Sequence, residues 1–172
     1  MAERIPFEET NLDIYGSQVL NWSDVRDALA IRQGSEMIYF LGTVRSDGRP
    51  HAAGVGPYYH DGDFYLVTGL HTQKAKNFTA NPAATLSTRI LGYDLTLEGM
   101  IDRVIDPETL ETLAAIYREG GWPAEVEGDA LTAPYSAPSA GPPPWQVFRF
   151  RISQAVVLKL SEEGGATRWR FH

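Results

Sequence analysis

The chain has 172 residues, of which 43% are hydrophobic and 22% charged, with no cysteine and a formal net charge of -7. The absence of cysteine excludes disulfides, thiolate chemistry and Cys-ligated zinc or iron–sulfur sites, and the acidic balance argues against nucleic-acid binding. We find neither a transmembrane span nor a signal peptide, so we expect a cytoplasmic protein with one domain over residues 1–172.

The first predicted elements are an N-terminal arm over residues 1–20 and a helix over 21–34. Asn21 has the side chain of a helix N-cap, and Gly34 is a typical stop. Two strands over 37–45 and 50–59 follow, joined at Asp47-Gly48, where glycine accepts the positive φ of a tight hairpin turn. These elements predict an antiparallel meander.

Residues 64–86 form the most informative segment. An apolar strand ends at Thr68, and a loop with Gly69 and Thr72 leads into a short helix that carries Lys74 and Lys76. Backbone N–H groups at a helix N-terminus, with lysines beside them, attract phosphate. The segment therefore predicts a phosphate site, although a lysine pair is often only a solvated helix face.

Further strands are expected over 83–90, 93–105, 145–160 and 166–171, with a helix beginning at Asp106. Residues 122–144 read as an irregular proline-rich loop, of which residues 132–144 form either a lid or a stiff surface loop. Together these elements predict an α+β fold, an antiparallel barrel of about six to seven strands with two or three peripheral helices.

With these elements in place, the chain resembles the pyridoxamine-5'-phosphate-oxidase-like family of split β-barrels from about residue 25 to residue 171. The order and spacing of four segments carry the likeness: FLGTVRSDGRPH (40–51), DFYLVT (63–68), TQKAKN (72–77) and NPA (81–83). The final GATRWRF (165–171) is similar to small actinobacterial-type members.

The resemblance implies an oxidoreductase, a homodimer that binds FMN or the deazaflavin F420 non-covalently between subunits and reduces a small organic substrate. It also implies the cofactor-binding residues: Thr68, Gly69, Thr72, Gln73, Lys74 and Asn77 at the phosphate, Ala52, Ala53, Gly54 and Val55 along the ring system, and Arg168 and Trp169 from the neighbouring subunit. The strand pattern alone also suits Trp169 as a core residue that pins the last strand.

One departure bears on the reaction. Vitamin-oxidising members have arginines at the positions of Ala53 and Gln73, so this chain lacks two cationic contacts to FMN. The resemblance thus argues against pyridoxamine phosphate oxidation, and the KAKN sequence of residues 74–77 favours F420 over FMN.

Two alternatives remain open. A non-catalytic cofactor-binding or carrier protein is compatible with the lack of an obvious acid–base or nucleophile set, since a flavin or deazaflavin supplies its own redox chemistry. A heme-handling split barrel would use His51, His60 or His71 as ligand. The four histidines have no metal-ligand spacing, so no metal site is expected.

Overall fold

The computed structural model describes residues 4–31, 38–135 and 140–172. Within them lie three helices and eleven strands. In chain order these are β1 (Glu8–Asn11), α1 (Trp22–Ile31), β2 (Tyr39–Val44), β3 (Pro50–Val55), β4 (Tyr58–His60), β5 (Asp63–Thr68), α2 (Gln73–Ala80), β6 (Ala83–Ile90), β7 (Tyr93–Val104), α3 (Pro107–Glu119), β8 (Glu125–Glu127), β9 (Ala130–Thr132), β10 (Gln146–Lys159) and β11 (Ala166–Arg170).

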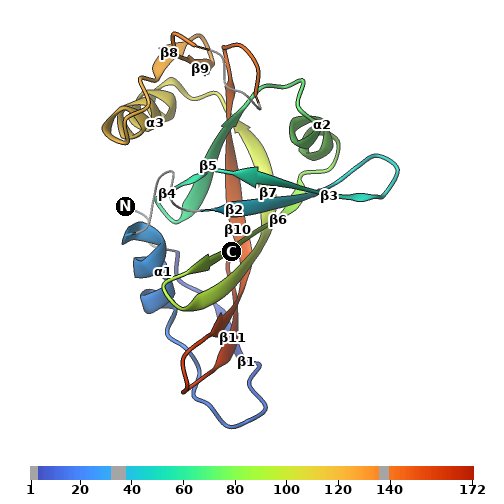
Figure 1. Ribbon diagram of the computed structural model, residues 1–172, viewed down its shortest axis with the longest axis vertical. Helices are drawn as coiled ribbons and strands as arrows, with labels where there is room; N and C mark the ends of the chain where they lie inside the picture. The colour runs from blue at the N-terminus through green and yellow to red at the C-terminus, as the bar shows by residue number, and fades with distance from the viewer. Residues whose placement is uncertain (1–3, 32–37, 136–139) are drawn as a thin grey trace.

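Nine of the strands form one antiparallel sheet. Its main path runs β1-β11-β10-β7-β6-β2-β3, and β5, which also pairs with β4, joins it through β10. Figure 1 shows β10 running along the length of the molecule, with α3 and the β8–β9 hairpin towards one end and β1 and β11 towards the other. The predicted antiparallel α+β architecture is confirmed, and β3 is an edge strand of this sheet.

The predicted number of strands, six to seven, was too low for three reasons. The arm contains β1, which pairs with β11; the predicted strand 50–59 is two strands; and β8 and β9 form a hairpin inside the loop 122–144. Pro57 has no N–H to donate to a ladder, which accounts for the break between β3 and β4. Strands of three residues are too short to leave a periodic pattern. Two predicted boundary residues, Gly34 and Met37, and positions 136–139 of the loop lie outside the described residues.

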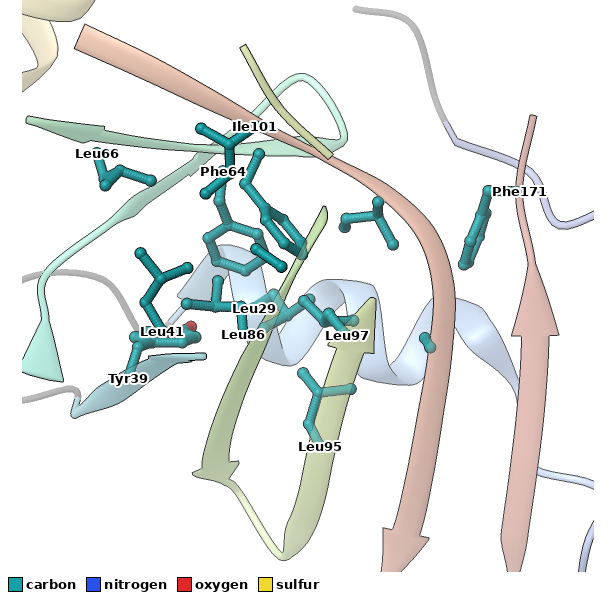
Figure 2. Close-up of a cluster of buried hydrophobic side chains, with 14 of the residues drawn as sticks. Leu29, Tyr39, Leu41, Phe64, Leu66, Leu86, Leu95, Leu97, Ile101 and Phe171 are labelled. Atoms are coloured by element: carbon teal, nitrogen blue, oxygen red, sulfur yellow. The ribbon is translucent and has the colours of Figure 1, made fainter. Parts of the chain in front are cut away.

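Helix α1 contributes to the main hydrophobic core. Its apolar stripe of Val25, Ala28 and Leu29 is buried against the inner face of the sheet. Figure 2 shows further side chains of this core, among them Tyr39, Leu41, Leu86, Leu95 and Leu97. No helix in the described parts of the chain has both the length and the apolar character that crossing a membrane requires.

Strand β5 is buried on both faces, which explains its uninterrupted apolar sequence. Phe64 and Leu66 belong to the main core, whereas Tyr65 packs in a second cluster with Leu110 and Leu113 of α3. Alternate side chains of a strand point to opposite faces, so one strand serves two cores. It therefore fixes the position of the loop that follows Thr68.

The first residue of β5, Asp63, is a fully buried carboxylate. It accepts hydrogen bonds from Arg149 Nε at 2.7 Å, from Arg4 at 3.1 Å and from the backbone N–H of Ile152 at 3.2 Å. A buried charge needs such partners. These contacts fasten the N-terminal segment to β5 and β10.

Gly99 is required where β7 passes β10. A Cβ at this position would overlap the carbonyl oxygen of Arg151, whereas a Cβ on Gly54 would meet open space. We expect Gly99→Ala to lower the free energy of unfolding by about 1–3 kcal/mol, because backbone must move to admit the methyl group. Gly54→Ala, the control, should change it by less than about 1 kcal/mol. Urea denaturation of both variants measures the difference, and equal midpoints would contradict the expectation.

Candidate functional site

The outer face of β3, β2, β6 and β7 has a floor of small residues. Ala52, Gly42, Thr85 and Glu98 are successive partners across these four strands, so they form one transverse row. A groove of about 690 Å³ is lined by all four, together with Ser153 of β10. Three of the four side chains in the row are small or absent, so the floor suits a flat ligand.

Large apolar side chains flank this floor. Phe40 and Ile38 are 54% and 66% exposed on one side of the row, and Val44 and Met100 are 38% and 42% exposed on the other. A second groove of about 610 Å³ is lined by Ile38 and Phe40 and extends to Leu158 of β10. A cluster of apolar residues on one exposed face is more often a site of contact with another molecule than an ordinary solvent-exposed surface.

Helix α2 is tied to β2 beside the groove by a buried polar chain. The Gln73 amide donates to Asn77 Oδ1 at 2.7 Å, and the Asn77 amide donates to Thr43 Oγ1 at 2.9 Å. Thr43 and Asn77 are both 3% exposed. Thr43 Oγ1 also lies 3.4 Å from Nδ1 of His51, which lines the groove. Asn77 thus fixes the position of the helix, and its side chain is not open to solvent.

The hydroxyl groups of Thr68 and Thr72 build the loop before α2. Thr72 is the N-cap: its Oγ1 donates to Gly69 O at 2.9 Å and accepts from Ala75 N at 3.4 Å. Thr68 is fully buried, and its Oγ1 lies 3.2 Å from Thr72 Oγ1. Both hydroxyls are therefore engaged within the loop. What remains for an anion is the set of N–H groups that a first helical turn leaves without intrahelical partners.

Gly69 allows the loop to pack closely. A Cβ there would come within 2.7 Å of the carbonyl oxygen of Ala140 and of the His71 ring. His71 itself is exposed and lies beside Gly141. The other two histidines predicted as heme ligands lie elsewhere, His51 on β3 and His60 on β4.

The basic groups of the site gather near the first turn of α2. Lys74 is half-buried, burial lowers the pKa of its ammonium group, and the described residues provide it with no hydrogen bond or ion pair. Partial burial also lowers the pKa of His51, and the positive charges of Arg45 and Lys74 lower it further. Lys76, two residues on, is exposed. A chain of net charge -7 thus concentrates positive charge at one end of the groove.

The four residues predicted along the ring system divide between the two faces of β3. Ala52 lines the groove, and Gly54 is exposed opposite Phe40. Ala53 is half-buried, and Val55 packs against the main core. In any contact with a ligand, β3 would therefore offer mostly backbone and the small side chain of Ala52.

Arg168 and Trp169 stand apart from the groove within one chain. They lie on β11, which β10, β7, β6 and β2 separate from β3. Trp169 is fully buried, and its Nε1 donates to Glu9 Oε2 at 2.8 Å. Arg168 donates to Thr10 Oγ1 at 3.2 Å. Trp169 accordingly has a structural role within this chain.

Sequence reasoning missed Thr43, Arg45 and Glu98 as residues of the site, and it considered His51 only as a heme ligand. The pairing of β2 with β3 brings Thr43 opposite His51. Glu98 joins them through β6 and β7, whose register places residues more than fifty positions apart in one row. The single signal in the sequence was the segment FLGTVRSDGRPH, which contains Thr43, Arg45 and His51.

A nine-stranded antiparallel sheet with a groove at β2 and β3 and a basic helix N-terminus beside it is the architecture of a split β-barrel. Residues 27–158 match the sequence profile of the family described as "Pyridoxamine 5'-phosphate oxidase". This match spans more than half of the chain, and the chain belongs to that family. The resemblance inferred from the sequence is confirmed.

Solved structures support the same fold. A pyridoxamine 5'-phosphate oxidase-related, FMN-binding protein from Nostoc punctiforme is 16% identical, with a TM-score of 0.58 over 88% of this chain and 91% of that chain. A FAD-binding protein from Mesorhizobium loti is 16% identical, with a TM-score of 0.55 over 87% and 95%. A structure described as an F420 reductase is 20% identical, with a TM-score of 0.53 over 76% and 94%. No curated protein sequence matches the chain. These similarities confirm the predicted α+β split β-barrel.

Proposed function

We propose that this protein is a homodimeric oxidoreductase that binds F420 or FMN non-covalently and reduces a small organic substrate. The observation that carries the proposal is Lys74, a half-buried ammonium group without a counter-ion among the described residues, at the N-terminus of α2 beside the groove. Partial burial of a cation without a partner costs free energy, and a bound anion offsets that cost. Membership of the family supplies the chemical class.

The residues present suit such a cofactor. The groove volume of about 690 Å³ lies within the range of small-molecule pockets, roughly 300–1,000 Å³. Gly42, Ala52 and Thr85 form a flat floor for a ring system, and Lys74 with the first-turn N–H groups of α2 provides an anion site. A phosphorylated ligand with a planar ring would use both.

Of the two cofactors, we favour F420. The positions that hold arginines in the vitamin-oxidising members are Ala53 and Gln73 here, and the Gln73 side chain is bonded to Asn77. A phosphodiester carries one negative charge, whereas the phosphate of FMN carries up to two. A site with fewer cations suits the less charged group.

The cofactor, when bound, supplies hydride transfer. The residues of the chain would hold it: α2 and Lys74 bind its anionic group, and the β2–β3 floor orients its ring. The apolar side chains around the floor, such as Phe40 and Met100, would exclude water and so protect the reduced ring from side reactions.

The proposed dimer would form through the face that carries the two grooves. Its exposed apolar side chains would be covered, and in a two-fold arrangement each subunit would present the same face to the other. We expect Phe40→Glu to give a monomer and to weaken cofactor binding at least tenfold, because it places carboxylates at an apolar interface, which costs several kcal/mol. Light scattering and fluorescence titration measure the two effects.

Ile105→Glu is the matched control for the predicted effect of Phe40→Glu on dimer formation. Ile105 is a comparably exposed apolar residue, at 61%, but it follows the end of β7 and lines neither groove. This variant should keep the oligomeric state of the wild type. A dimeric Phe40→Glu protein would place the interface elsewhere.

A titration of the purified protein with F420 and, separately, with FMN tests the proposed cofactor. Fluorescence of the bound ring should be quenched for at least one of them, and the absorbance spectrum of the protein as purified gives an independent reading. Binding to neither cofactor would refute the proposal.

A non-catalytic cofactor carrier is the second candidate. Glu98 and His51 are the titratable side chains among the described groove-lining residues. The hydroxyl beside His51, that of Thr43, is 3% exposed and accepts a hydrogen bond from Asn77, so it is poorly placed to attack a substrate. Protein loaded with reduced cofactor and offered quinones, enones and tetrapyrroles separates the two functions. Steady reoxidation by any of them would support the oxidoreductase, and tight binding without turnover the carrier.

A further inference from the structure

His51 lies at the junction of the groove and helix α2. It lines the groove, and the Thr43 hydroxyl lies 3.4 Å from its Nδ1 and also 3.4 Å from its carbonyl oxygen. Thr43 in turn accepts the bond from Asn77, whose side-chain oxygen accepts from Gln73, the first residue of α2. A continuous chain of polar side chains thus connects the proposed anion site to this imidazole.

The Thr43 hydroxyl contacts the His51 ring at Nδ1. Thr43 Oγ1 accepts a hydrogen bond from Asn77, and donation of its proton to the His51 carbonyl oxygen leaves its second lone pair for Nδ1. A proton on Nδ1 can be donated to that lone pair, so the contact is compatible with the imidazolium form. Within the described residues Nε2 has no hydrogen-bond partner, so it is available to a ligand.

The two charged groups that shift the pKa of His51 are both positive, and Glu98, which lines the same groove, is not among the groups that shift it. Arg45, just after β2, and Lys74 of α2 are the two charged groups that act on it, and Thr43 and Asn77 from the same two elements are neutral. Together with partial burial, these cations lower the pKa of His51, which favours the neutral imidazole in the free protein.

We propose that His51 is a second recognition residue for the anionic group of the cofactor, and that it gains a proton when this group binds beside Lys74. The inference rests on the proposed function, because it needs an anion at that place. A bound phosphate offsets the charges of Arg45 and Lys74, so it favours the imidazolium form and gains a charge-assisted hydrogen bond from Nε2.

The sign of the pH dependence follows from this linkage. The pKa of His51 is higher in the complex than in the free protein, so the cofactor binds more tightly as the pH falls through these two values. Well above both values, His51 is neutral in both states and adds no pH dependence. A rise of about one unit corresponds to a roughly tenfold gain in affinity.

The decisive measurement is an NMR titration of the imidazole Cε1–H resonances with FMN and with riboflavin, which has the same ring system but no phosphate. F420 is compared in the same way with its deazaflavin chromophore without the phosphodiester tail. His51→Gln identifies the resonance, and His60 on β4 is an internal reference. We expect the pKa of His51 to rise by about one unit with the phosphorylated ligand and to stay nearly constant with its phosphate-free counterpart.

Binding curves between pH 5.5 and 8 provide a second reading. The phosphate of FMN itself ionises in this range, so the informative quantity is the difference between wild type and His51→Gln, in which that ionisation cancels. The wild type should gain roughly tenfold over the variant at the acidic end. Thr43→Val should reduce this gain because it removes the hydroxyl that orients His51, and Thr43→Ser should restore it.

The outcomes separate the two proposals. If a cofactor binds but the pKa of His51 does not move, or moves equally with the phosphate-free ligand, the inference about His51 is wrong and the proposed function stands. If neither FMN nor F420 binds, both are wrong.

Discussion

Lys74→Ala should weaken the binding of F420 or FMN by ten- to a hundredfold, the expected loss of a charge-assisted contact to an anion. Lys74 is half-buried and lacks an ion pair among the described residues, so its substitution leaves no carboxylate of the protein unpaired and the loss falls on the contact to the ligand. Burial lowers the pKa of the ammonium group, and a bound anion would raise it again. The change in affinity is measured by quenching of cofactor fluorescence.

Lys76→Ala is the matched control for this prediction. Lys76 lies on the same helix, two residues further on, and is exposed to solvent. Its substitution should weaken binding by no more than about threefold, since an exposed charge is well screened. Equal losses for the two variants would mean that the helix contributes only a general positive field and that Lys74 does not contact the ligand.

Trp169→Ala should lower the free energy of unfolding by about 3–5 kcal/mol, the usual cost of deleting a large aromatic side chain from a core. Trp169 is fully buried, its ring lies 5.5 Å from that of Trp22, and its Nε1 is bonded to Glu9. Its strand lies between β1 and β10, so the loss would loosen three strands at one edge of the sheet. Urea denaturation measures the effect.

The role of Trp169 in cofactor binding is decided by Trp169→Phe. This variant keeps an aromatic ring in the core, so it should remain folded and should bind cofactor with the affinity of the wild type. If the Trp169→Phe protein is folded but binds the cofactor at least tenfold more weakly, Trp169 contacts the cofactor, as the family resemblance implies.

The sequence predicted the elements around the site because they carry strong local signals. The apolar run of β5, the Thr72 cap and the Pro82 break bounded helix α2, and Asp106 with Pro107 marked the start of α3. Each of these features depends on residues within a few positions of one another, so local chemistry decides them.

The hydroxyl groups of Thr68 and Thr72 make contacts that local reasoning did not predict. Thr72 uses its oxygen as the helix cap, and Thr68, the last residue of a strand buried on both faces, lies next to it. Their role at a phosphate stays a prediction. The groove itself could not be predicted, because it arises from the register of four strands. Glu98 reaches the row of Ala52 only through Thr85 and Gly42, and that pairing has no local signature.

The position of β3 at the edge of the sheet has a consequence for divergence within the family. An edge strand presents unpaired amide and carbonyl groups on its outer side. In the proposed complex a planar heterocycle would lie against main-chain atoms of β3, so the side chains there need only stay small at Ala52 and fill the core at Val55. Motif searches that require particular residues at positions 52–55 would therefore overlook proteins that hold such a ligand in the same way.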